Sequence, residues 1–131
     1  MSSHLLRVAL VDDDESVRCA LSRLLRAAGM VVDAYASGNE FIRSLGEGLH
    51  EAPDCIVLDV RMPVMSGIEV QQRLGKSHPG FPIVFITAHD DPADRQAVLE
   101  AGARACLNKP FSEQQLLAAI LSATANPAHS A

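Results

Sequence analysis

The chain has 131 residues, of which 48% are hydrophobic and 21% charged, and its formal net charge is −5 at pH 7. This size suits a single domain with one hydrophobic core, and no apolar run approaches the roughly 20 residues that cross a bilayer. The negative charge and the absence of tryptophan disfavour direct nucleic-acid binding by this segment. Three widely spaced cysteines disfavour a disulfide framework and predict a cytoplasmic location.

The first part of the chain predicts strands that alternate with helices. An apolar run over 5–11 predicts a buried strand. Apolar residues at helical spacing predict a helix over about 15–28, with Asp14 as its N-cap. A second strand follows at 31–35, and a Ser-x-x-Glu capping box at 37–40 begins a short helix.

The second part continues the alternation. Strands are expected at 55–58, 82–86 and 103–107, and helices at 66–76, 90–101 and from 112 onward. The expected apolar face of the fourth helix is Ala93, Ala97, Val98 and Ala101, and that of the fifth is Leu116, Leu117, Ile120 and Leu121. We expect one domain over 1–124, followed at 125–131 by a tail or the start of a linker.

Five continuous apolar strands joined by five helices predict a doubly wound α/β fold with a parallel sheet. Spacing alone does not give the strand order, but five strands fit the flavodoxin-like order 2-1-3-4-5. In such sheets, ligands bind beyond the carboxyl ends of the strands.

Polar side chains gather at those strand ends. They are Asp12 and Asp13 after the first strand, Asp59 at the third, Thr87 at the fourth and Lys109 after the fifth. Each has a plainer explanation by itself, such as a cap, a strand end or a solvated loop charge. Together, the carboxylates form a set of hard oxygen ligands that repel one another unless a cation such as Mg²⁺ is bound.

The chain resembles the receiver domain of two-component response regulators over residues 5 to about 124. The motifs that carry the resemblance are Val11-Asp12-Asp13-Asp14-Glu15, Leu58-Asp59-Val60-Arg61-Met62-Pro63, Met65-Ser66-Gly67, Thr87-Ala88, Ala101-Gly102-Ala103 and Lys109-Pro110-Phe111. The Arg-Met-Pro and Met-Ser-Gly motifs are similar to those of receivers that precede a helix-turn-helix DNA-binding domain.

The resemblance implies that Asp59 takes a phosphoryl group from a sensor histidine kinase in the presence of Mg²⁺. The metal ligands would be Asp12, Asp13, Asp59 and the backbone carbonyl of Arg61. The domain would then be a switch that catalyses only its own phosphorylation and dephosphorylation and is not otherwise an enzyme.

The resemblance also implies roles for the residues around the phosphoacceptor. Lys109 would pair with Asp59 and later with the phosphoryl oxygens. The Thr87 hydroxyl and the Ala88 backbone amide would hold the phosphoryl group. The Lys109–Pro110 peptide is expected to be cis.

One departure from the family pattern concerns the readout, and two further residues bear on the lifetime of the phosphoryl group. Cys106 stands where the family usually has Tyr or Phe, so the usual rotation of an aromatic side chain cannot be the signal. Signalling could instead rest on Thr87 and the loop that follows it, and Cys106 is either a small buried thiol or a redox sensor. Arg61 and His89 each lie two residues beyond a site residue, where they could flank the phosphoryl group or simply be solvated.

The sequence is compatible with three outputs or activities. The first is control of transcription through a separate DNA-binding domain, with a possible homodimer through the fourth helix, fifth strand and fifth helix. The second is a stand-alone receiver that acts on a protein partner. The third, an Mg²⁺-dependent phosphatase with an aspartyl nucleophile, is disfavoured because Arg61 stands where such enzymes carry a general acid. A nucleotide- or flavin-binding module is excluded by the acids at 12–14, which would repel phosphate.

Overall fold

A computed structural model describes residues 5–47, 52–77, 80–88 and 91–125. Within these ranges five strands alternate with five helices, as predicted. In chain order they are β1 (Arg7–Val11), α1 (Glu15–Ala27), β2 (Val31–Tyr35), α2 (Gly38–Glu47), β3 (Cys55–Asp59), α3 (Gly67–Ser77), β4 (Ile83–Thr87), α4 (Pro92–Glu100), β5 (Ala105–Asn108) and α5 (Glu113–Ala125). His89 and residues 126–131 of the tail predicted at 125–131 lie outside the described residues, and Ala125 is the last residue of α5. No helix in the described part of the chain is long and apolar enough to span a membrane.

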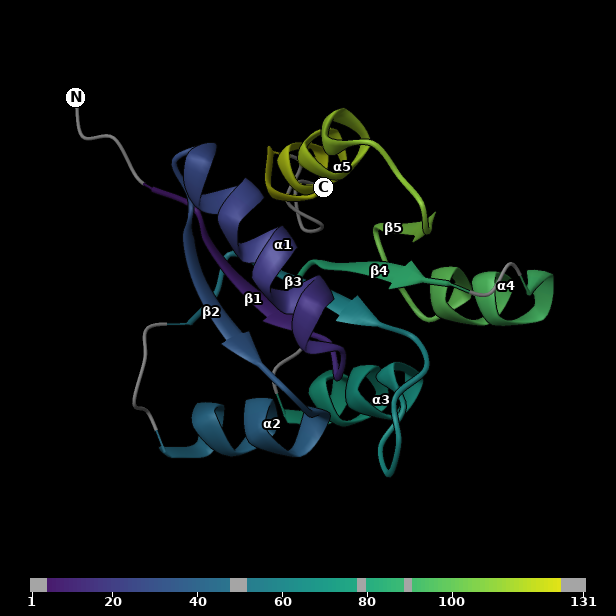
Figure 1. Ribbon diagram of the computed structural model, residues 1–131. Helices are drawn as coiled ribbons and strands as arrows, with labels where there is room; N and C mark the ends of the chain where they lie inside the picture. Colours follow the sequence, from purple (N-terminus) through teal and green to yellow (C-terminus); the bar gives the residue numbers. More distant parts are fainter. Residues whose placement is uncertain (1–4, 48–51, 78–79, 89–90, 126–131) are drawn as a thin grey trace.

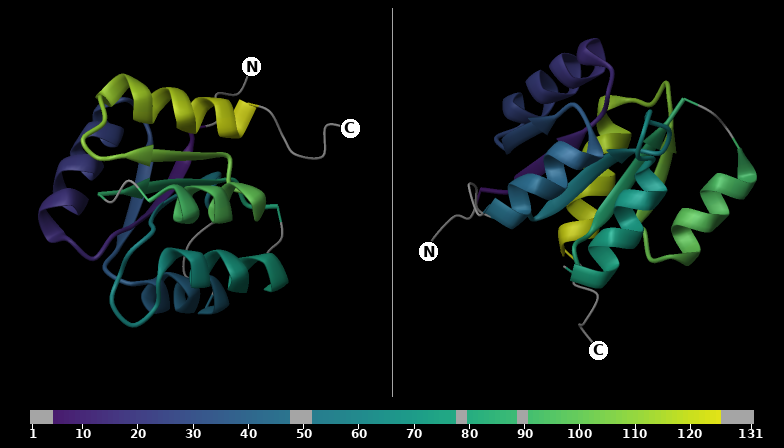
Figure 2. Two further views of the ribbon diagram at one scale, coloured as in Figure 1. Left: turned by 90° about the vertical axis from the view of Figure 1, so that its right-hand side faces the viewer. Right: turned by 90° about the horizontal axis from the view of Figure 1, so that it is seen from below.

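The sheet has the order β2-β1-β3-β4-β5, and all neighbouring strands are parallel, which confirms the predicted fold class. Helices cover both faces (Figures 1 and 2). One core cluster joins α1 and α5 to one face of the sheet, and the other joins α2, α3 and α4 to the opposite face. The five strands run side by side, so their carboxyl ends share one edge.

The strand ends differ slightly from the predicted ones, and the difference bears on the site. β3 and β4 each run one residue further and end at Asp59 and Thr87. Both residues stay in the ladder, because Asp59 is in register with Ile86 and Thr87 with Asn108. The backbone of these two polar residues is therefore held by the sheet.

The predicted helix starts are confirmed by their hydrogen bonds. Asp14 Oδ1 accepts from the amide of Ser16 at 2.9 Å and caps α1. At α3, the Ser66 hydroxyl accepts from the Glu69 amide at 3.2 Å, and a Glu69 carboxylate oxygen accepts from the Ser66 amide at 3.0 Å. These caps satisfy amide groups that have no partner within the helix, so local sequence sets where the helices begin.

The predicted apolar face of α4 is wrong in three of its four positions. Only Val98 is buried, whereas Ala93, Ala97 and Ala101 are exposed. A methyl side chain offers little apolar area to bury, so three alanines draw the helix only weakly towards the sheet. On α5, Leu121 was also expected to be buried but is 51% exposed.

Candidate functional site

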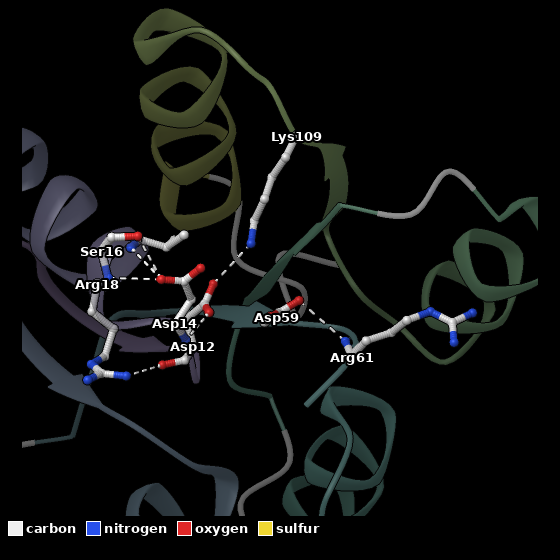
Figure 3. A network of polar contacts seen from close by, with 8 residues as sticks. Asp12, Asp14, Ser16, Arg18, Asp59, Arg61 and Lys109 are labelled. Carbon is white, nitrogen blue, oxygen red and sulfur yellow. Dashed lines mark hydrogen bonds and ion pairs between the residues drawn. The ribbon is translucent and has the colours of Figure 1, made fainter. Parts of the chain in front are cut away.

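The carboxyl edge of the sheet brings together the five polar residues singled out in the sequence. Asp12 follows β1 and is completely buried, while Asp59 and Thr87 at the ends of β3 and β4 are 7% and 3% exposed. Asp13 is exposed beside Asp12, and Lys109 reaches in from the segment after β5 (Figure 3). Their convergence follows from the parallel sheet, because these strands are neighbours in space but far apart in sequence.

Three carboxylates form the centre of the site. One oxygen each from Asp12, Asp13 and Asp59 lies within 4.8 Å of the other two. Carboxylate oxygens are the ligands that Mg²⁺ takes, usually with waters completing its octahedron, and the exposed side of Asp13 leaves room for water. The donor set therefore fits a hard divalent cation.

The electrostatics of Asp59 point to the same need for positive charge. Burial, together with the nearby Asp12 and Asp13 carboxylates, raises the pKa of the Asp59 carboxyl to about 7. Lys109 and a 3.3 Å hydrogen bond from the Arg61 amide to Asp59 Oδ1 act in the opposite direction on this pKa. A bound cation would favour the ionised form of Asp59.

Lys109 makes a different ion pair from the one expected. Its Nζ lies 3.2 Å from Asp12 Oδ2, rather than pairing with Asp59 (Figure 3). The other Asp12 oxygen accepts from the Asp14 amide at 2.9 Å. A fully buried carboxylate requires more compensation than a partly solvated one, which explains why the ammonium sits on Asp12 in this state.

The segment around Thr87 and Lys109 is organised by the backbone. The Lys109 amide donates to the Thr87 carbonyl at 2.7 Å. The Lys109–Pro110 peptide is cis, as expected. Ala88 directly follows Thr87 and is exposed.

Gly67 permits a close approach that the sequence pattern did not reveal. A Cβ at this position would lie 2.2 Å from the backbone oxygen of Asp59. The Gly67 amide donates to the Val60 carbonyl at 2.8 Å, which joins the start of α3 to the end of β3. Only glycine fits here, and it fixes the backbone that carries Asp59.

The Arg61 side chain is not simply solvated. Its guanidinium turns away from Asp59 towards α4 (Figure 3), and Nη2 lies 2.7 Å from Asp94 and 3.3 Å from Asp91. Sequence reasoning missed both partners. Asp91 before Pro92 was recognisable as a helix N-cap, but a contact with Arg61, 30 residues away, leaves no local signal.

Cys106 is buried at 7% exposure in β5, and its backbone carbonyl accepts from Arg95 of α4 at 2.9 Å. A small thiol at this position fills little space, in keeping with the departure noted from the sequence.

Comparison with known proteins agrees with this site. The family model of the response regulator receiver domain matches residues 8–121. Response regulator protein TmoT of Ectopseudomonas mendocina is 40% identical over 116 residues, which cover 88% of this chain and 51% of TmoT. The DNA-binding transcriptional regulator NtrC of Salmonella typhimurium is 34% identical over 86% of this chain and 24% of NtrC.

Solved structures show the same fold. The response regulator receiver protein from Burkholderia phymatum is 44% identical, with a TM-score of 0.82 over 95% of this chain and 98% of that chain. This chain spans about half the length of the first curated relatives that it matches. The fold, the carboxylate edge and these matches together show that the chain belongs to the response regulator receiver domain family of two-component systems.

Proposed function

We propose that Asp59 accepts a phosphoryl group from a sensor histidine kinase and that this event switches the surface of the domain. The observation that carries the proposal is the position of Asp59. It is a nearly buried carboxylate among two other acids, and the raised pKa shows that its charge is poorly compensated. A lysine that reaches the same cluster supplies positive charge.

Asp12, Asp13, Asp59 and the Arg61 backbone carbonyl would hold Mg²⁺. When bound, the ion supplies positive charge that offsets both the carboxylates and the incoming phosphoryl group. The Asp59 oxygen forms its bond to phosphorus as the N–P bond of the donor histidine breaks. An ionised carboxylate needs no deprotonation before it attacks, so positioning and charge are the main requirements.

Lys109, Thr87 and Ala88 would stabilise the product. The Lys109 ammonium can exchange its contact with Asp12 for the phosphoryl oxygens, because a phosphoryl group carries more negative charge than one carboxylate. Thr87 ends the adjacent strand β4 and Ala88 follows it, so the Thr87 hydroxyl and the Ala88 amide can donate to the remaining oxygens.

The output is proposed from the relatives. TmoT is named a response regulator and NtrC a DNA-binding transcriptional regulator, so residues 1–124 would act as a receiver that controls transcription through a separate DNA-binding segment. Residues 125–131 would be a tail or linker. A homodimer through α4, β5 and α5, and a cytoplasmic location, belong to the same proposal. The phosphatase alternative remains disfavoured, because Arg61 is neither an acid nor a base at neutral pH.

Mass spectrometry with acetyl phosphate and Mg²⁺ tests the proposal. Wild-type protein should gain one phosphoryl group and Asp59→Asn none, because the amide is not a nucleophile for this reaction. Lys109→Ala should weaken the phosphorylation response. Asp33→Asn, which changes an acid of β2 away from the carboxylate edge, is the matched control and should be labelled normally. Labelling of Asp59→Asn at the wild-type rate would contradict the assignment.

A further inference from the structure

Helix α4 is attached to the domain mainly by polar contacts. Val98 is its only buried side chain among the described residues. Gln71 of α3 donates through Nε2 to the Val98 carbonyl at 3.1 Å, and Arg95 donates to the Cys106 carbonyl at 2.9 Å. Arg61 provides the contact to the N-terminal end of the helix. Individual polar contacts contribute little net stability, so the position of α4 can change at small cost.

Arg61 contacts both the phosphoacceptor and this helix. Its backbone amide donates to Asp59 Oδ1 at 3.3 Å. Its guanidinium forms ion pairs with Asp94 at 2.7 Å and Asp91 at 3.3 Å. The Arg61 side chain is 50% exposed, so it can rotate between partners without leaving a packed core.

The start of α4 does not depend on Arg61 for its cap. Asp91 Oδ1 accepts from the Ala93 amide at 2.9 Å, and Asp91 Oδ2 is the oxygen that faces Arg61. Asp94 lies in the first turn, where a negative charge is favoured by the helix dipole. Loss of the guanidinium would therefore leave the helix formed while removing its contact with the loop after β3.

We propose that Arg61 transmits phosphorylation of Asp59 to α4 by exchanging its ion pairs with Asp91 and Asp94 for the phosphoryl group. This inference rests on the proposed function. In the unphosphorylated chain Arg61 holds the N-terminal end of α4, and in the phosphorylated chain it releases that end. The exchange supplies a readout that does not involve the buried thiol of Cys106.

Charge decides the direction of the exchange. A phosphoryl group brings about −1.5 to −2 charges and three acceptor oxygens to the position where Asp59 had one charge. The guanidinium fork pairs with phosphoryl oxygens in a bidentate and charge-assisted way. Its present partners are partly exposed carboxylates, 41% exposed at Asp91 and 24% at Asp94, and ion pairs near the surface are weak. The phosphoryl group therefore attracts the Arg61 guanidinium more strongly than Asp91 and Asp94 do, and the side chain rotates towards it.

Hydrogen–deuterium exchange of the peptide 92–100, with and without acetyl phosphate and Mg²⁺, tests the inference. Phosphorylation of the wild type should speed exchange in this peptide by about two- to five-fold, the range expected when a weak exposed ion pair is lost. Asp94→Ala removes the shorter pair without touching the phosphoacceptor cluster. It should show faster exchange before phosphorylation and a smaller further change after it.

Two further substitutions test whether the change in exchange depends on the Arg61 ion pairs. Glu100→Ala removes a negative charge from the same helix, but Glu100 contacts Gln96 rather than Arg61, so its response to phosphorylation should match the wild type. Arg61→Ala removes both pairs and should abolish the phosphorylation-dependent change in α4, and Arg61→Lys should restore part of it.

The masses of the same samples separate the two proposals. Phosphoryl incorporation with unchanged exchange in 92–100, or a full wild-type response in Asp94→Ala, would overturn the inference about Arg61 alone. Failure of Asp59 to incorporate a phosphoryl group would overturn the proposed function and the inference together.

Discussion

Helices α1 and α4 both lie against the parallel sheet, but they are held by different kinds of contact. α1 buries Leu21, Ser22 and Leu25, and its leucines belong to the core cluster beneath it. α4 buries Val98 alone and depends on side chains that reach across from other elements. Each buried leucine contributes about 1.5–3 kcal/mol, whereas an exposed ion pair contributes up to about 1 kcal/mol.

This difference would suit the two ends of the proposed switch. Two of the three acids of the carboxylate cluster, Asp12 and Asp13, lie just before α1. Like charges held close together need a rigid backbone, because a flexible one would let them move apart. The helix that would report the event must instead move when a small free energy is supplied. Apolar anchoring at α1 and polar attachment at α4 meet these opposite requirements.

Leucine-to-alanine variants on the two helices should show the largest effect. Leu25→Ala removes a completely buried side chain from α1 and should lower the free energy of unfolding by about 3 kcal/mol. Leu99→Ala on α4 removes a side chain that is 40% exposed and should change it by less than about 1 kcal/mol. Urea unfolding measures both, and equal losses would show that the two helices are anchored alike.

A substitution at the carboxylate edge should raise the free energy of unfolding instead of lowering it, because the uncompensated negative charge of Asp59 destabilises the folded state. The folded pKa of Asp59 is raised from 3.8 to about 7. The stability associated with its protonated form is therefore complete below about pH 4 and is lost as the pH rises to about 7. Without Mg²⁺ at about pH 8, Asp59→Asn should be more stable than the wild type by on the order of 2 kcal/mol.

Urea unfolding in chelator across this pH range measures the effect. The two proteins should converge near pH 4, and Mg²⁺ should reduce the difference at high pH by compensating the wild-type charge. A variant that is no more stable than the wild type at high pH in chelator would show that the Asp59 charge is already compensated.

The smallest expected effect on stability comes from replacing either of two arginines that make the same kind of contact. Arg95 of α4 donates to the Cys106 carbonyl at 2.9 Å, and Arg26 of α1 donates to the Val32 carbonyl at 3.1 Å. Arg95→Ala and Arg26→Ala should each change global stability by about 1 kcal/mol or less. Only Arg95→Ala should speed hydrogen exchange in its own helix, because α1 keeps its buried leucines. Similar local changes in both helices would remove the distinction between them.

Much of this architecture could be predicted from local sequence. Continuous apolar runs indicated buried parallel strands, and the capping residue Asp14 and the Ser66–Glu69 box marked helix starts that hydrogen bonds confirm. The polar residues at the strand ends were identified because parallel strands share an edge. The apolar face of α4 was wrong, since alanines satisfy helical spacing without supplying enough area to be buried.

The contacts of individual charges could not be predicted in the same way. Lys109 was expected to form an ion pair with Asp59. It pairs with Asp12 instead, because the Asp12 carboxylate is completely buried. The partners of Arg61 are 30 and 33 residues away, and the requirement for Gly67 arises from the backbone of Asp59 rather than from its own helix.

The sequence by itself determined the alternation of strands and helices, the set of acids at one edge and the family, because apolar period, capping chemistry and motif order are local properties. Only the tertiary structure decided which carboxylate receives Lys109, where the Arg61 guanidinium is held and how lightly α4 is attached. Those outcomes depend on relative burial and on distances between segments far apart in the chain, and the fold sets both.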